Sequence, residues 1–185
     1  MKSRRRNWLL LPSCAALTAA ALSADGAVNV EASSIVATFT QQHVPVDAAF
    51  ANFSGAIRYD AAHPEAATAA LQVAVASLDL GDADASAEVR KPAWFDSAHF
   101  PQATFRSSLI KPGTAGHFDA TGTLTIKGRA QVVTVSVAVQ KAGAGNAFDG
   151  SFELSRRAFG IGDPSWDGLL GDSVRVRFHL LAAGA

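Results

Sequence analysis

The sequence predicts an all-β domain, an eight-stranded antiparallel β-barrel with a short helical insertion. Three observations predict it: alternation of apolar and polar residues, turn signals between the alternating runs, and one alanine-rich segment that breaks the alternation. In residues 133–139, for example, every second residue is valine and those between are small or polar. Successive side chains of a strand point to opposite faces, so one face of each run is buried and the other is solvated. This pattern is typical of an antiparallel sheet covered on one side.

Turn signals divide the chain into the expected strands. His63-Pro64, Lys111-Pro112-Gly113, Lys127-Gly128 and residues 142–146 each mark a reversal. The expected strands occupy residues 34–41, 46–59, 68–79, 103–110, 117–127, 130–141, 147–157 and 173–183. About eight strands give a closed barrel whose interior can hold one small ligand, and closure removes exposed strand edges.

Residues 82–91 form the one segment that breaks the alternation. The segment is rich in alanine, acidic at its start and basic at its end, and Pro92 follows it. That order of charges complements a helix dipole, so we expect a short helix laid across one mouth of the barrel. Two interpretations stay open: a lid over a cavity, or a plug that only closes the core.

The first 23 residues have the composition of a cleaved export signal. A basic head of Lys2 and residues 4–6 precedes an apolar stretch at 8–22, which ends in small residues. This stretch is short for a membrane span. We therefore divide the chain into a signal at 1–23, cut near Ser23 or Gly26, and one domain at 24–185 that is periplasmic or secreted.

The signal leaves two details open and removes the only cysteine. Arg5-Arg6 and the residues after it fit a twin-arginine signal, and an ordinary secretory signal fits equally well. Residues 11–14 weakly resemble a lipoprotein cleavage box, but the apolar stretch continues past Cys14. Because Cys14 leaves with the signal, the mature domain has no disulfide or thiol chemistry.

No local motif in the chain indicates catalysis or a metal. The five histidines are isolated, and the sequence has no nucleophile elbow, phosphate loop or dinucleotide fingerprint. The mature domain is mildly acidic, because the signal carries four basic residues and no acidic one, and it has no basic stripe for nucleic acid. The sequence thus predicts a protein that is not an enzyme and binds no metal, cofactor or nucleic acid.

Large apolar side chains on the inward faces are the candidate ligand contacts. Each of them alone is more often core packing, but a barrel of this size either fills itself or keeps an apolar cavity. Small inward residues such as Ala37, Gly122 and Gly150 leave space beside the large ones. The candidate lining residues are Phe39, Phe50, Phe53, Ile57, Trp94, Phe95, Phe105, Leu124, Val135, Phe152, Phe159 and Trp166.

Seven pieces of the sequence follow one another in a recognisable order: Phe39 with Gln42-His43; Phe50 with 53–57 and Tyr59-Asp60; 94–96; Phe100-Pro101 with Thr104-Phe105; 122–128; Arg156 with 159–161; and 172–176. In these pieces the chain, from about Ser34 to its end, resembles the YceI family of periplasmic, polyisoprenoid-binding-like proteins. The chain departs from the usual family pattern at Ala48, Ala130 and Ala158 and in the loop 162–168, which many members shorten.

The resemblance implies a lipocalin-like barrel with a long hydrophobic pore for an isoprenoid chain, and it favours the lid interpretation. The leading hypothesis is a periplasmic carrier for a polyisoprenoid or isoprenoid quinone. On this hypothesis His43, His99 or Arg156 contacts the polar head of the lipid. The alternative for each of these side chains is a solvent-facing structural role. The alternative is a packed structural or stress-response barrel without lipid. The hypothesis ranked last is an enzyme that handles quinones with a membrane b-type cytochrome as its partner. A homodimer is a further expectation.

Overall fold

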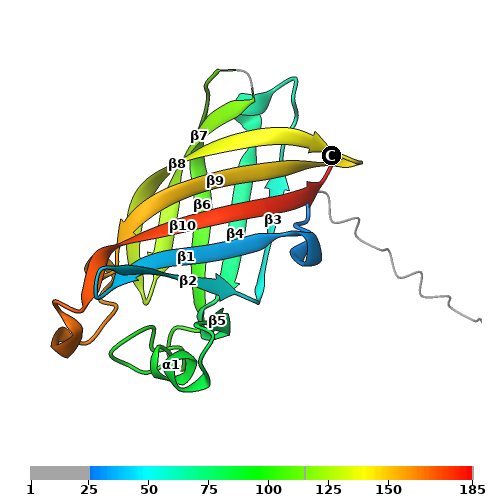
Figure 1. The fold of residues 1–185 in the computed structure, drawn as a ribbon. Helices are drawn as coiled ribbons and strands as arrows, with labels where there is room; N and C mark the ends of the chain where they lie inside the picture. Colours follow the sequence, from blue (N-terminus) through cyan, green and yellow to red (C-terminus); the bar gives the residue numbers. More distant parts are fainter. Residues whose placement is uncertain (1–25, 115, 185) are drawn as a thin grey trace, which may run out of the picture.

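The computed structural model describes residues 26–114 and 116–184, so the expected signal at 1–23 lies outside the described residues. Ten strands form one curled sheet (Figure 1). The strands are β1 (Ser34–Gln41), β2 (Val44–Phe50), β3 (Phe53–Arg58), β4 (Thr68–Ala74), β5 (Leu78–Asp79), β6 (Gln102–Pro112), β7 (His117–Ile126), β8 (Arg129–Ala142), β9 (Gly145–Ser155) and β10 (Leu170–Ala183). The α-helix of this part of the chain is α1 (Ala83–Glu88), and the short 3-10 turns are η1 (Val30–Ala32), η2 (Pro64–Ala66), η3 (Val75–Ser77), η4 (Arg157–Phe159) and η5 (Pro164–Trp166).

The all-β, barrel-like class is confirmed, and the count of eight strands is wrong. The expected strand 46–59 is interrupted at Ala51 and Asn52, which separate β2 from β3. The expected strand 68–79 is interrupted by η3, which separates β4 from β5. The two interruptions lie against each other: Ala51 N–H donates to Ser77 O (3.2 Å), and Ala74 N–H donates to Asn52 O (2.9 Å). Two strands thus bend at one shared corner.

The ladder of strands does not close completely. Its order is β3-β4-β6-β7-β8-β9-β10-β1-β2-β5, with antiparallel pairing throughout, so β3 and β5 are the end strands. In Figure 1, β9, β10 and β1 cross in front of β3, β4 and β6. Residues 26–29 bridge β3 and β10 at one end, where Ile57 N–H donates to Gly26 O (2.7 Å) and Val28 pairs with Ala182. The sheet is therefore barrel-like, whereas the sequence predicted a closed barrel.

The expected helix is present but shorter than predicted. Asp82 caps its start, because its carboxylate accepts from Ala85 N–H (2.8 Å), and the helix proper ends at Glu88. The tight reversal expected at Lys127-Gly128 is confirmed. Both residues have positive φ (49° and 72°), as the favoured two-residue hairpin turns require.

Ion pairs cross the solvent face of β2, β1, β10 and β9. Arg177 meets Asp47 at 2.8 Å, Arg175 meets Glu153 at 2.8 Å, and His179 Nδ1 lies 2.7 Å from an Asp149 carboxylate oxygen. Because these pairs are exposed, each contributes little to stability. They keep the outer face polar, so the apolar face of the same strands must turn inward.

We expect the Thr38→Val variant to raise the pKa of Asp47 on this outer face. The Thr38 hydroxyl donates to Asp47 (2.6 Å), and this hydrogen bond, followed by the charge of Arg177, holds the pKa of the carboxyl below its usual value of 3.8. A depressed folded-state pKa contributes stability above pH 3.8 that is lost as the pH falls through the folded pKa. The variant therefore loses less stability on acidification.

Carboxyl NMR titration measures this pKa directly. Thr38→Ser is the matched control, because it keeps the hydroxyl and should titrate like the wild type. Equal pKa values of Asp47 in the valine and serine variants would contradict the assignment.

Candidate functional site

Two apolar cavities occupy the interior of the curled sheet. The larger, of about 190 Å³, lies toward the end that carries β5 and the segment around α1, since Leu78, Leu80 and Val89 line it. The smaller, of about 110 Å³, lies near the end of β3, since Ile57 and Tyr59 line it. Nearly all lining side chains of both cavities are apolar. The site is therefore suited to hydrocarbon and poorly suited to an ionic substrate.

Three phenylalanine rings form the boundary between the two cavities. Phe105 of β6, Phe152 of β9 and Phe178 of β10 line both of them. Glycines leave room for two of these rings: a Cβ on Gly122 would lie 2.6 Å from Phe105 Cζ, and one on Gly150 would lie 2.5 Å from Phe178 Cζ. The space expected beside these glycines is thus occupied by rings.

Nine of the twelve candidate lining residues face a cavity. Those on the larger cavity are Phe39, Phe50, Trp94, Phe95, Phe105, Leu124 and Phe152, and those on the smaller cavity are Ile57, Val135, Phe105 and Phe152. Their contact with a ligand stays a prediction.

The other three candidates, Phe53, Phe159 and Trp166, line neither cavity. Phe159 is completely buried in the core, and Trp166 packs edge-on against Trp94 with ring centroids 6.0 Å apart. Phe178, Leu71 and Val73 also line the larger cavity and were not among the predicted lining residues. Alternation along β4 and β10 places all three on the inward face and was the signal that could have found them.

The segment after α1 covers the end of the larger cavity. Val89, Trp94 and Phe95 contribute to the cavity wall, and Figure 1 shows α1 beside β5 at that end of the sheet. Two hydrogen bonds fasten the segment to the rest of the fold: Lys127 Nζ donates to Pro92 O (2.7 Å), and Gly162 N–H donates to Ala93 O (3.0 Å). Lys127 Nζ also donates to Gly160 O (2.8 Å), in the loop after η4. The segment thus lies over a cavity instead of plugging a filled core.

We expect the Lys127→Met variant to loosen this covering segment. Burial lowers the pKa of Lys127, yet its ammonium group is satisfied by the two carbonyls, and methionine cannot donate to either. Amide hydrogens of residues 89–96 should then exchange with deuterium several-fold faster, because local opening costs less free energy. Hydrogen-exchange mass spectrometry measures this rate. The control is Lys91→Met, which removes an exposed lysine of the same segment, and equal acceleration in both variants would contradict the role of Lys127.

Arg156 is buried and hydrogen-bonded to the loop before β10. Its side chain is 6% exposed, and it donates from Nε to Gly171 O (3.0 Å), from Nη1 to Ile161 O (2.9 Å) and from Nη2 to Asp167 Oδ1 (3.0 Å) and Leu170 O (3.3 Å). A Cβ on Gly162 would lie 2.2 Å from Nη1, so only glycine fits there. Arg156 lines the larger cavity, and its hydrogen bonds hold the loop in place. Its role is therefore structural, as one interpretation expected, but its side chain is buried and does not face solvent.

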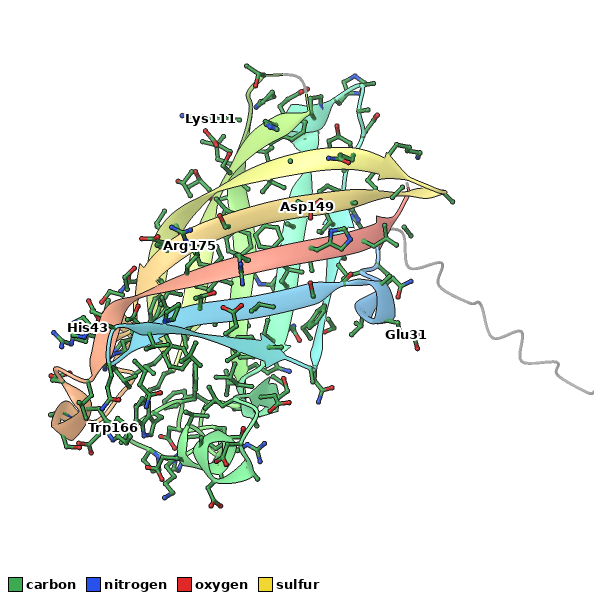
Figure 2. The ribbon with its side chains drawn as sticks, viewed as in Figure 1. Glu31, His43, Lys111, Asp149, Trp166 and Arg175 are labelled. Atoms are coloured by element: carbon green, nitrogen blue, oxygen red, sulfur yellow. The ribbon has the colours of Figure 1, made fainter. Side chains whose placement is uncertain are left out.

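The other two head-group candidates are exposed and lie outside both cavities. His43 lies in the β1–β2 turn with a φ of +67°, and Figure 2 shows it near the same end of the sheet as Trp166. His99 is exposed, and its Nδ1 lies 2.8 Å from Asp96 Oδ1. The structure therefore places only Arg156 of the three on a cavity wall.

The described part of the chain shows neither a metal site nor a membrane-spanning helix. Within residues 26–114 and 116–184, no group of three or more His, Cys, Asp or Glu side chains could hold a metal ion. Among the same residues, no helix has the length and apolar character needed to cross a membrane.

The fold and its cavities define a small barrel-like protein with an apolar interior. The chain belongs to the YceI-like family, since the YceI-like domain matches residues 27–182. A UPF0312 protein of Shewanella sp. (strain ANA-3) is 31% identical over 133 residues, which cover 70% of this chain and 68% of the relative. A UPF0312 protein of Azotobacter vinelandii is 28% identical over 152 residues, or 76% and 78% of the two chains.

Solved structures share the fold. BcnA of Burkholderia cenocepacia is 39% identical with a TM-score of 0.82, over 84% of this chain and 99% of that one. A polyisoprenoid-binding domain from Saccharophagus degradans is 18% identical with a TM-score of 0.71, over 86% and 98%. At this identity, the second likeness is one of fold alone.

Proposed function

We propose that this chain is an exported binding or carrier protein for a long-chain apolar lipid, of the polyisoprenoid or isoprenoid-quinone class. The observation that carries the proposal is the pair of apolar cavities separated by Phe105, Phe152 and Phe178. A chain of isoprene units that displaces these rings would extend from one cavity into the other. The polyisoprenoid-binding domain of S. degradans, which has the same fold, supports this ligand class.

The affinity would come mainly from the tail of the lipid. Removal of apolar surface from water contributes roughly 25 cal/mol per Å², so about 300 Å² of ligand surface would contribute about 7.5 kcal/mol. The walls offer few polar groups to select a head, and four of the five N–H groups of Arg156 are already engaged. We therefore expect tail length to decide binding more strongly than head charge.

The alternative is a packed structural or stress-response barrel. Such a protein would fill its interior with side chains, so the two cavities favour a binding protein. A catalytic role has no candidate cluster of side chains on the cavity walls, which are almost entirely apolar.

Identification of co-purified lipid tests the proposal. The protein is exported from a bacterial host, purified without detergent, and extracted with organic solvent for lipid mass spectrometry. We expect an isoprenoid alcohol or quinone in near-stoichiometric amount. Extracts that contain only bulk phospholipid, together with failure to take up an added polyisoprenol, would refute the proposal.

A further inference from the structure

The outer face of β3, β4 and β6 carries a hollow of about 330 Å³. It lies outside the curled sheet, because Ile57 and Phe105, the chain neighbours of Arg58 and Arg106, point inward and line the cavities. In Figure 1 these strands lie behind β9, β10 and β1. The hollow is lined by Ala56, Arg58, Thr68, Ala69, Ala70, Arg106 and Ser107. Within the part of the chain that the structure describes, its walls thus carry two cations and no carboxylate.

The register of the strands brings the two arginines to this one hollow. Ala70 of β4 pairs with Ala56 of β3 on one side and with Arg106 of β6 on the other. Arg58 pairs with Thr68, one step along the same face. Two strand spacings across and two residues along place the arginine Cα atoms about 12 Å apart. Because only alanine methyl groups form the floor between them, the two guanidinium groups can reach one ligand from opposite sides.

Neither of these two arginines forms an ion pair with a residue that the structure describes. The other half of the outer face is different. There Arg175 meets Glu153 and Arg177 meets Asp47, each at 2.8 Å. Arginines on the outer face are thus balanced by carboxylates on β2, β1, β10 and β9, whereas the charge of the hollow is left for a ligand.

The polar groups beside the hollow do not remove its positive charge. Asp60, two residues after Arg58, accepts from Ala62 N–H (2.8 Å) and lies 3.2 Å from His63 Nδ1, so its carboxylate is held in the turn after β3. Ser107 Oγ accepts from a backbone N–H of β4 (2.9 Å), which leaves its own O–H to donate to a ligand. The hollow therefore offers hydrogen-bond donors together with two positive charges.

We propose that this hollow binds a small molecule that carries a phosphate group. Guanidinium groups donate paired hydrogen bonds to phosphate oxygens, and one phosphate dianion balances two of them. A single carboxylate balances only one. The recessed shape fits a separate molecule better than the surface of a membrane, because no large apolar side chain in the lining could insert between lipids.

Titration with glycerol 3-phosphate, followed in ¹⁵N–¹H spectra, tests this site. The amide signals of residues 55–58, 68–70 and 105–107 should shift together and saturate. Arg58→Gln and Arg106→Gln should each weaken binding by about tenfold, as the loss of a hydrogen bond to a charged group predicts. Both positions are exposed, so we expect the variants to fold like the wild type.

The matched control is Arg175→Gln, which removes an arginine from the other half of the outer face and should bind glycerol 3-phosphate like the wild type. Acetate, a monocarboxylate, should bind at least tenfold more weakly than glycerol 3-phosphate. Equal weakening in all three variants, equal affinity for acetate, or shifts spread over the whole surface would show general attraction of anions and overturn the proposal.

Vesicles of phosphatidylglycerol distinguish a small phosphate compound from a membrane surface. The wild-type protein should stay in solution when such vesicles are sedimented. Sedimentation with the vesicles that is lost in Arg58→Gln and Arg106→Gln would assign the hollow to a membrane and contradict the proposal. The hollow lies outside the cavities, so none of these results depends on a lipid in the interior, and the proposed function stands or falls separately.

Discussion

Replacement of Val73 with tryptophan should weaken the binding of a long isoprenoid by about 100-fold or more, which corresponds to a loss of about 2.7 kcal/mol of binding free energy. Val73 lies in β4 and lines the larger cavity. Tryptophan is the bulkiest side chain, and its indole would occupy space that the proposal gives to the lipid tail. Binding is measured by titration of the purified variant with a fluorescent polyisoprenol analogue.

The control is tryptophan at the neighbouring position. Gln72 belongs to the same strand but is exposed on the opposite face, because side chains alternate along β4. Gln72→Trp should bind the lipid like the wild type, while both variants keep the circular dichroism spectrum of the fold. Undiminished binding by a folded Val73→Trp variant would show that the lipid does not use this cavity.

Replacement of Arg156 with methionine should lower the free energy of unfolding by about 3–5 kcal/mol. Removal of one partner from a buried charged network is strongly destabilising, because the remaining groups lose their hydrogen bonds without regaining water. Here the carbonyls of Ile161, Leu170 and Gly171 would each lose a donor. Denaturant unfolding monitored by tryptophan fluorescence measures the change.

Arg157 offers a matched control for this variant. Its side chain also contacts Asp167 (3.0 Å), but it is 52% exposed. Arg157→Met removes the same kind of group at the surface, and we expect a loss of at most about 1 kcal/mol. Similar losses in the two variants would contradict the structural role of Arg156.

The sequence predicted the faces of the strands better than their ends. Alternation assigned the inward side correctly along β7, β8, β9 and β10, because one buried face imposes a period of two. It missed the breaks at 51–52 and at η3, where no proline or glycine marks a turn. Those breaks depend on a long-range contact, in which Asn52 N–H donates to Ser77 Oγ (3.0 Å). No local pattern contains that information.

The apolar character of the candidate site was predictable from the sequence, but its division into two cavities was not. Aromatic and aliphatic residues at inward positions indicated an apolar interior. The boundary between the cavities depends on how Phe105 lies over Gly122 and Phe178 over Gly150, which are neighbours only across strands. The burial of Arg156 likewise depends on loops that fold back from distant positions.

Native mass spectrometry of the purified protein with a C20 isoprenoid alcohol tests the central claim most directly. If the cavities hold an isoprenoid chain, the spectrum will show one lipid per chain for the wild type and for Gln72→Trp, and none for Val73→Trp. The absence of a bound lipid in the wild type, or equal binding in all three proteins, would contradict the account.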